Sequence, residues 1–263
     1  MIENTADYVS LMTARARGHL PDMGCALRVA ELISEASRQT QTGDDRISIL
    51  DVGCAAGHFL RTFIRRNLPL RKHVGLEIDP AMIRAANEVW RAEVGSGAAE
   101  FINEDLERST VGETYDVVIC VNAFMYFASA RTALTRLMRA ARGRVLIRSY
   151  FTDSNYRIVR AQTTRNHDKS QVDELAAFDD AGNILCYDLW NIYSYSYMEA
   201  LVRTIEAKAR VEWIEDRNVL SSLEEEGKLN LQKRGATELL GEYEVSYPFI
   251  LPWKYLSIDM SDA

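Results

Sequence analysis

Long apolar runs are absent from this sequence. No stretch approaches the run of about 18 apolar residues that a membrane-spanning helix needs. The first 20 residues carry acids early and no apolar segment followed by small residues, so we expect no secretory signal there. These absences predict a cytoplasmic protein without a membrane partner.

Metal-ligand patterns and excess positive charge are also missing. The four cysteines and four histidines are scattered, with no Cys-x-x-Cys pair, so we expect reduced thiols and no bound metal. Lys and Arg number 31 against 38 Asp and Glu, which gives a formal net charge of −7. Nucleic-acid binding needs a positive surface. We therefore expect a small-molecule substrate, no nucleic acid, and a monomer or homodimer.

What the sequence does contain is a regular alternation of strand-like and helical segments between residues 47 and 150. The chain has 263 residues, 47% of them hydrophobic, which suits one large globular domain. Alternation of this kind predicts a parallel sheet covered by helices on both faces. The strand-like runs are RISIL, KHVGLEI, AAEFIN, YDVVICV and RVLIRSY.

The segments on either side of this unit follow different patterns. Two amphipathic helices are expected before it, over residues 8–17 and 23–33. After it, residues 174–190 have two strand-like runs around the turn DDAGN and predict a hairpin. A helix over residues 197–208, a strand over 209–216, a helix-and-loop insertion over 220–241 and a strand over 253–259 follow. Because no crossover helix joins the last two strands, we expect the final strand to be antiparallel.

The stretch DVGCAAG, residues 51–57, joins the first strand to a helix. A glycine loop at this place is typical of sites for nucleotide-like cofactors. An NAD pyrophosphate would lie close to the negative charge of Asp51, which is unfavourable, whereas a cationic ligand that bears an amine suits it. The loop therefore favours S-adenosylmethionine over a dinucleotide.

At these residues the sequence resembles the class I S-adenosylmethionine-dependent methyltransferases. Their first motif matches at Asp51, Gly53 and Gly57, with Ala55 in place of the middle glycine. We expect Ala55 to keep a negative φ, where alanine costs little. The motifs VGLEIDP, NEDLE and YDVVICVNAFMYF follow in the family's order. The resemblance implies that further cofactor contacts come from Glu77 at the ribose, Ile78 beside the adenine, Asp105 and Leu106 at the adenine amino group, and Asn122.

The resemblance also implies a fold and a division of the chain. We expect an α/β, Rossmann-like, doubly wound and mostly parallel seven-stranded sheet, with an antiparallel last strand and an inserted cap. Residues 1–44 would form helices over the site, 45–150 the cofactor-binding core, and 151–263 the cap and the final strands of the same domain. The expected activity is methyl transfer to a hydroxyl or amine of a small metabolite. The nucleic-acid adenine methyltransferases have two prolines after the fourth strand, and this chain lacks them.

Acceptor contacts must come from outside the shared core. We expect them from Tyr8, Met12, Tyr126, Trp190 and Tyr193, because polar aromatic side chains suit a metabolite pocket. His167 is the candidate general base, since imidazole titrates near neutrality. The aromatic residues could instead bury the hairpin, and His167 could be a solvated loop residue. A non-catalytic S-adenosylmethionine-binding regulator and an NAD-dependent oxidoreductase remain the alternative functions.

Overall fold

The computed structural model describes residues 5–37, 46–109, 112–161, 179, 181–183, 187–216, 237–240, 243–246, 249–250 and 253–261. The helices are α1 (Thr5–Arg17), α2 (Gly24–Ser37), α3 (His58–Arg65), α4 (Pro80–Val89), α5 (Arg91–Gly95), α6 (Ala130–Ala140) and α7 (Tyr195–Ile205), with a short 3₁₀ turn η1 (Phe124–Tyr126). The strands are β1 (Ile47–Val52), β2 (Leu70–Glu77), β3 (Ala99–Asn103), β4 (Tyr115–Val121), β5 (Ala141–Thr152), β6 (Tyr156–Ala161), β7 (Tyr187–Ser194), β8 (Arg210–Glu215), β9 (Thr237–Leu240), β10 (Tyr243–Ser246), β11 (Phe249–Ile250) and β12 (Trp253–Asp259).

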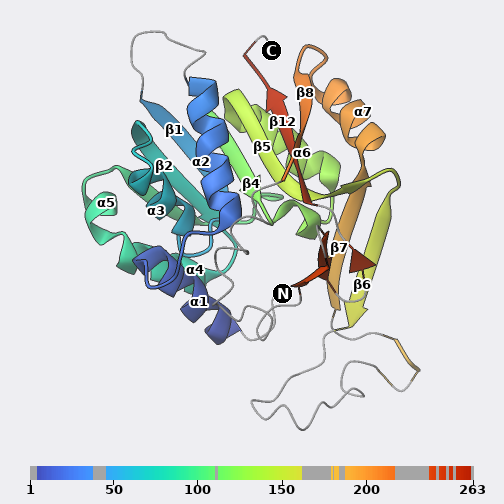
Figure 1. The fold of residues 1–263 in the computed structure, drawn as a ribbon, viewed down its shortest axis with the longest axis horizontal. Coiled ribbons are helices and arrows are strands. Elements are labelled where there is room, and N and C mark those ends of the chain that lie inside the picture. Colours follow the sequence, from blue (N-terminus) through green and yellow to red (C-terminus); the bar gives the residue numbers. More distant parts are fainter. Residues whose placement is uncertain are drawn as a thin grey trace.

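The main sheet has the order β3-β2-β1-β4-β5-β12-β8 (Figure 1). The first five strands are parallel to one another, and β12 is antiparallel to both of its neighbours, β5 and β8. The predicted mostly parallel sheet with an antiparallel last strand is confirmed, but β7 and β6, which join at the end of β5, extend the seven predicted strands to nine. The parallel strands and β8 therefore end at the same edge of the sheet, and β12 begins there.

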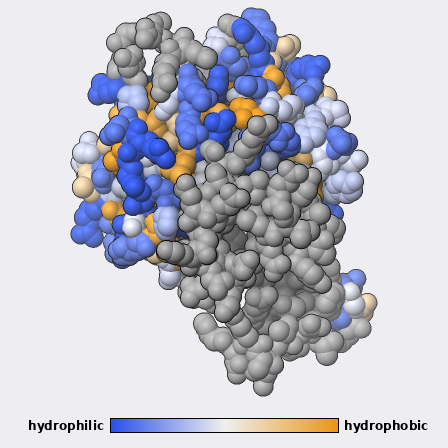
Figure 2. All heavy atoms as spheres, in the orientation of Figure 1, coloured by the Kyte–Doolittle hydropathy of each residue, from blue (hydrophilic) through white to orange (hydrophobic). Residues whose placement is uncertain are grey.

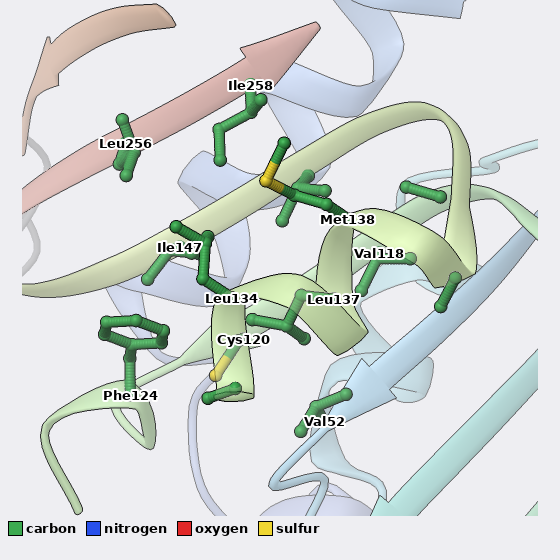
Figure 3. Close-up of a cluster of buried hydrophobic side chains, with 14 of the residues drawn as sticks. Val52, Val118, Cys120, Phe124, Leu134, Leu137, Met138, Ile147, Leu256 and Ile258 are labelled. Atoms are coloured by element: carbon green, nitrogen blue, oxygen red, sulfur yellow. The ribbon is translucent and has the colours of Figure 1, made fainter. Parts of the chain in front are cut away.

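Helices cover both faces of the sheet, as the strand and helix alternation predicts. On one face, buried side chains of α2 and α3 pack on β1, β4, β5 and Tyr255 of β12. On the other face, buried side chains of α6 and α7 pack against the strand side chains that point to that face. Figure 3 shows Leu134, Leu137 and Met138 of α6 directed at Val118, Ile147 and Ile258 of the sheet. Because helices cover both faces of the sheet, a ligand site is expected at the ends of the strands.

Local sequence signals set where several helices begin. Asp79 caps α4 by accepting from the N–H of Ala81 at 2.8 Å, and Pro80 occupies the first helical position. Ser129 and Ser194 cap α6 and α7 in the same way. These caps fix the points at which the chain leaves the carboxyl-end edge of the sheet.

The region after β5 departs from the predicted hairpin. Strand β7 pairs antiparallel with β6 (residues 156–161) and, at its end, parallel with the last two residues of β5. The turn itself is present, because the side chain of Asp179 accepts from the N–H groups of Ala181 and Asn183; the rest of its first run lies outside the described residues. Residues 237–240, predicted within a helix-and-loop insertion, form β9 of a small antiparallel sheet with β10 and β11.

Helix α1 packs beside α3 and α4, at the lower side of the view in Figure 1. An ion pair of 2.5 Å joins Arg17 to Glu88 of α4, and Asp22 pairs with both Arg61 and Arg65 of α3. The described surface in Figure 2 has small hydrophobic groups among hydrophilic residues. Among the helices that the structure describes, none is long and apolar enough to cross a membrane.

Candidate cofactor and acceptor site

The sheet order reverses between β1 and β4, and the loops after these two strands touch. A Cβ atom on Gly53 would lie 2.7 Å from the Cβ of Ala123, and Gly53 has a φ of 79°. Both facts require glycine at position 53. In open α/β sheets, ligands bind at the carboxyl ends of the strands where the order reverses.

The glycine loop continues through Ala55 and Gly57. Gly57 has a φ of 76°, and a Cβ there would lie 2.7 Å from the indole nitrogen of Trp90. Ala55 has a φ of 48°, so the expectation that it keeps a negative φ is wrong. The left-handed conformation costs an alanine about 1–2 kcal/mol. Its N–H donates to Oε2 of Glu77 at 3.1 Å, which helps to hold that conformation.

Glu77 ends β2 and faces this loop. Its second oxygen, Oε1, accepts from the N–H of Asp79 at 3.0 Å. Burial raises the pKa of Glu77, although these backbone N–H groups oppose the shift. Ile78 follows with 65% of its surface exposed, which is unusual for a large apolar residue next to a polar loop. The pair offers a carboxylate and an apolar surface side by side.

Asp51 ends β1 as a buried acid. Its Oδ2 atom lies 3.6 Å from Nε2 of His73, whose ring sits between Phe63 and Phe101. Among the described residues, neither Oδ2 of Asp51 nor either ring nitrogen of His73 has a hydrogen-bond partner. A buried acceptor of this kind suits a ligand that brings a donor or a positive charge.

Asp105 and Leu106 lie after β3, as expected, but their side chains differ in role. Oδ1 of Asp105 accepts from the N–H of Glu107 at 2.9 Å, which shapes the turn. Leu106 is 2% exposed and belongs to the core beneath that turn. Of the two residues, only Asp105 has a partly exposed polar side chain that a ligand could contact.

Helix α1 brings a polar group to the glycine loop. Burial raises the pKa of Tyr8 to about 12. Its neighbours Tyr126 and Glu77 also raise this pKa, whereas Arg15 lowers it. Met12 is 7% exposed and packs with Cys54, Ala55 and Ala56 of the loop. Tyr8, Met12 and Tyr126 were expected together from the sequence, and the structure brings them to one side of the site.

Arg15 and His58 complete this side, and sequence reasoning missed Arg15. Nε of Arg15 is buried without a hydrogen-bond partner among the described residues. His58 opens α3, and burial together with the positive charge of Arg15 lowers its pKa to about 3. A neutral imidazole and an unsatisfied guanidinium nitrogen near a helix N-terminus suit an anionic group. Only the three-dimensional position of α1 reveals this role.

Asn122 follows β4, and its φ is 61°. Its Oδ1 accepts from Nη1 of Arg148, while Nε and Nη2 of Arg148 pair with Oδ2 of Asp216 at 2.6 and 2.5 Å. Arg148 also lies over the ring of Trp253, with Cζ 3.9 Å from the ring centroid. Arg148, Asp216 and Trp253 were not expected at the site, because three strands far apart in sequence bring them together.

The predicted acceptor residues separate into exposed and buried ones. Tyr126 is 47% exposed, and Trp190 is partly buried near Tyr150, with ring centroids 6.2 Å apart. Tyr193 is buried, stacks on Tyr197 and packs on Phe124, so the alternative of a core residue describes it better. His167 lies outside the described residues. The described part of the chain holds no cluster of three potential metal ligands.

The sheet order, the glycine loop after β1, the acid ending β2 and the antiparallel strand beside β5 together form the fold pattern of class I S-adenosylmethionine-dependent methyltransferases. The candidate site combines a sharp backbone turn, a carboxylate at Glu77, an exposed apolar surface at Ile78 and the guanidinium of Arg15, whose Nη1 donates to Pro21 while its buried Nε has no partner among the described residues.

Comparison with known proteins agrees with this class. Residues 49–143 match the family model of a methyltransferase domain, and S-adenosylmethionine is the cofactor of that family. A magnesium protoporphyrin IX methyltransferase from Synechocystis PCC 6803, with bound S-adenosylhomocysteine, has a TM-score of 0.54 and 12% identity over 98% of this chain and 94% of that one. The search of curated proteins found no match.

Two further solved structures share the fold. The plantazolicin methyltransferase BpumL, in complex with S-adenosylhomocysteine, has a TM-score of 0.52 and 17% identity, covering 97% of this chain and 91% of that chain. The [4+2]-cyclase SpnF has a TM-score of 0.51 and 12% identity, covering 89% and 80%. At these identities the likeness shows the fold alone.

Proposed function

We propose that this enzyme methylates a nitrogen or oxygen of a small molecule, with S-adenosylmethionine bound at the β1–β4 reversal. The observation that carries the proposal is the joined arrangement of Gly53, Ala55 and Glu77. Loop and carboxylate are held together before any ligand arrives, which reduces the ordering cost of binding.

The cofactor's parts find matching groups along the site. Glu77 would accept from the ribose hydroxyls through the lone pairs that the backbone N–H groups leave open. Ile78 would cover the adenine, and Asp105 and Asn122 would offer polar contacts at its two sides. Asp51 would attract the ammonium group, and Arg15 would pair with the carboxylate. Gly53 and Gly57 allow the close approach of the backbone, and Ala55 and Leu106 support it by packing.

When bound, S-adenosylmethionine supplies a methyl group activated by a positive sulfur. The residues of this chain then have to align the acceptor and exclude water. Tyr8 on α1 and Tyr126 on η1 lie within electrostatic reach of each other and close the site from one side. Trp190 would supply a further wall by contact, and the buried Tyr193 would contribute only indirectly, by packing on Phe124. His167 remains the proposed base for an acceptor that must lose a proton.

A regulator that binds the cofactor without transferring a methyl group is the second candidate. It stays open because the fold alone does not require methyl transfer: SpnF, whose name describes a cyclase, has a similar fold. The family match disfavours an NAD-dependent oxidoreductase, since the matched domain is a methyltransferase domain. The acceptor proposed here remains a small metabolite, and the proposed location remains the cytoplasm.

The experiment incubates the enzyme with S-adenosylmethionine labelled in the methyl group and with a library of small metabolites. Liquid chromatography with mass spectrometry then follows labelled products and S-adenosylhomocysteine. We expect one class of acceptors to carry the label on nitrogen or oxygen, and a Gly53→Val enzyme to form no product. Tight cofactor binding without any labelled product would favour the regulator.

A further inference from the structure

Asp216 is a buried carboxylate at the carboxyl-end edge of the sheet, one residue after β8. Its side chain is fully buried, and one of its oxygens, Oδ2, is held by two nitrogens of Arg148 at 2.5 and 2.6 Å. The other oxygen, Oδ1, is buried and has no hydrogen-bond partner among the residues that the structure describes. A buried acceptor without a donor is unfavourable, because it has lost its hydrogen bonds to water. A bound molecule with a donor would recover this cost.

Asp216 is connected to the proposed cofactor site through Arg148. Arg148 donates from Nη1 to Asn122, the residue that follows β4 directly. Asn122 is next to Ala123, which touches Gly53 of the cofactor loop. These contacts therefore link Asp216 to the glycine loop of the proposed cofactor site.

Aromatic rings surround the same cluster. Trp253 begins β12 and pairs in register with Tyr150 of β5, and their ring centroids are 4.0 Å apart. Trp190 continues the group at 6.2 Å from Tyr150, and Trp190 and Trp253 are only partly buried. The guanidinium of Arg148 lies over the Trp253 ring, with Cζ 3.9 Å from the ring centroid, and this contact restrains the ring. Such a group of rings suits a planar molecule.

Charge limits the choice of ligand further. Arg148 and Asp216 neutralise each other, and Arg28 of α2 is close enough to influence Asp216. A cationic acceptor would meet the positive sulfur with no net negative charge to compensate, and an anionic one would face the free oxygen of Asp216. A neutral donor avoids both penalties.

We propose, on the basis of the proposed function, that Asp216 anchors the methyl acceptor by accepting a hydrogen bond at Oδ1. The acceptor is then a neutral planar aromatic or heteroaromatic molecule with an N–H or O–H group, packed on Trp190 beside the edge of Trp253, because Arg148 and Tyr150 already cover the Trp253 ring. Arg148 is the positioning residue that turns the second oxygen of Asp216 toward this donor. Burial raises the pKa of Asp216 while Arg148 opposes the shift.

The test compares two neutral bicyclic probes, indole, which has an N–H donor, and benzothiazole, which has a ring nitrogen acceptor in a similar shape. Binding to the full-length enzyme saturated with S-adenosylhomocysteine is measured by ligand-observed NMR titration. We expect the wild type to bind indole about tenfold more tightly. In Asp216→Asn the carbonyl oxygen must stay toward Arg148, so the amide NH₂ takes the place of Oδ1. We expect the preference to reverse.

Glu215→Gln is the matched control, since Glu215 pairs with Lys254 and is more than half exposed. It should keep the wild-type preference. Equal affinity of the wild type for both probes, no binding of either, or equal loss of both in Asp216→Asn would overturn the proposal. If Asp216→Asn fails to fold, the relative affinity of the wild type for indole and benzothiazole still tests the proposal. Failure to bind S-adenosylhomocysteine at all would instead overturn the proposed function.

Discussion

The backbone N–H of Ala55 donates to Oε2 of Glu77 at 3.1 Å, so the loop after β1 is tied to the end of β2. This bond crosses 22 positions of sequence and unites the two motifs that the cofactor would contact. It also explains how alanine is held at a φ of 48°.

Removal of this carboxylate should weaken cofactor binding. We expect Glu77→Ala to lower the affinity for S-adenosylhomocysteine by about 1–3 kcal/mol, because ribose hydroxyls lose a partly buried acceptor. Isothermal titration calorimetry measures the change. Glu100→Ala on β3 is the control, since half-exposed Glu100 pairs with Lys72 away from the site. Unchanged affinity in Glu77→Ala would remove Glu77 from the cofactor site.

The pH dependence of binding should follow the same group. Burial raises the pKa of Glu77 above its ordinary value of 4.5, so the carboxylate takes up its proton at a higher pH than an exposed glutamate. Affinity for S-adenosylhomocysteine should therefore fall as pH drops through this raised pKa. The stability contribution has the opposite sign, because the neutral form favours the fold; it is present at low pH and is lost as pH rises through the raised pKa. Calorimetric titrations from pH 7 to 4.5 should show this fall in affinity for the wild type and a flatter affinity profile for Glu77→Gln. Identical affinity profiles would contradict the assignment of the pH dependence to Glu77.

Arg15 should recognise only the amino-acid end of the cofactor. We expect Arg15→Met to weaken binding of S-adenosylhomocysteine by about 1.5–3 kcal/mol, the range for a hydrogen bond to a charged group. Methylthioadenosine lacks the carboxylate and should bind both forms equally. Arg17→Met, which removes an exposed partner of Glu88, should leave both ligands unaffected. An equal loss for both ligands would show that Arg15 supports the fold instead.

The two tyrosines near η1 should differ in stability. Tyr126 is 47% exposed, so Tyr126→Ala should change the free energy of unfolding by less than about 0.5 kcal/mol. Tyr193 is buried between Phe124 and Tyr197, so Tyr193→Ala should cost about 3–5 kcal/mol. Urea denaturation compares the two. Similar losses would mean that Tyr126 also belongs to the core and does not line an acceptor site.

Several features that depend on local sequence were predicted correctly, whereas several that depend on contacts between distant residues were not. Strand β4 and strand β12 have the predicted bounds, because alternating and continuous apolar runs are local signals. The φ of Ala55 was missed, since it depends on Glu77 from another strand. The partner of β7 was missed for a similar reason, because the turn at Asp179 is a strong local signal whereas pairing with β6 depends on the extension of β5. Arg148 and Asp216 lie 68 positions apart and carry no motif.

The most direct test of the central claim is calorimetric titration of the wild type with S-adenosylmethionine, S-adenosylhomocysteine and NAD under the same conditions. We predict one-to-one binding of the first two, lost in Gly53→Val because a larger side chain would collide with Ala123, and no binding of NAD. Binding of NAD, or no binding of either sulfur compound by the folded protein, would contradict the account.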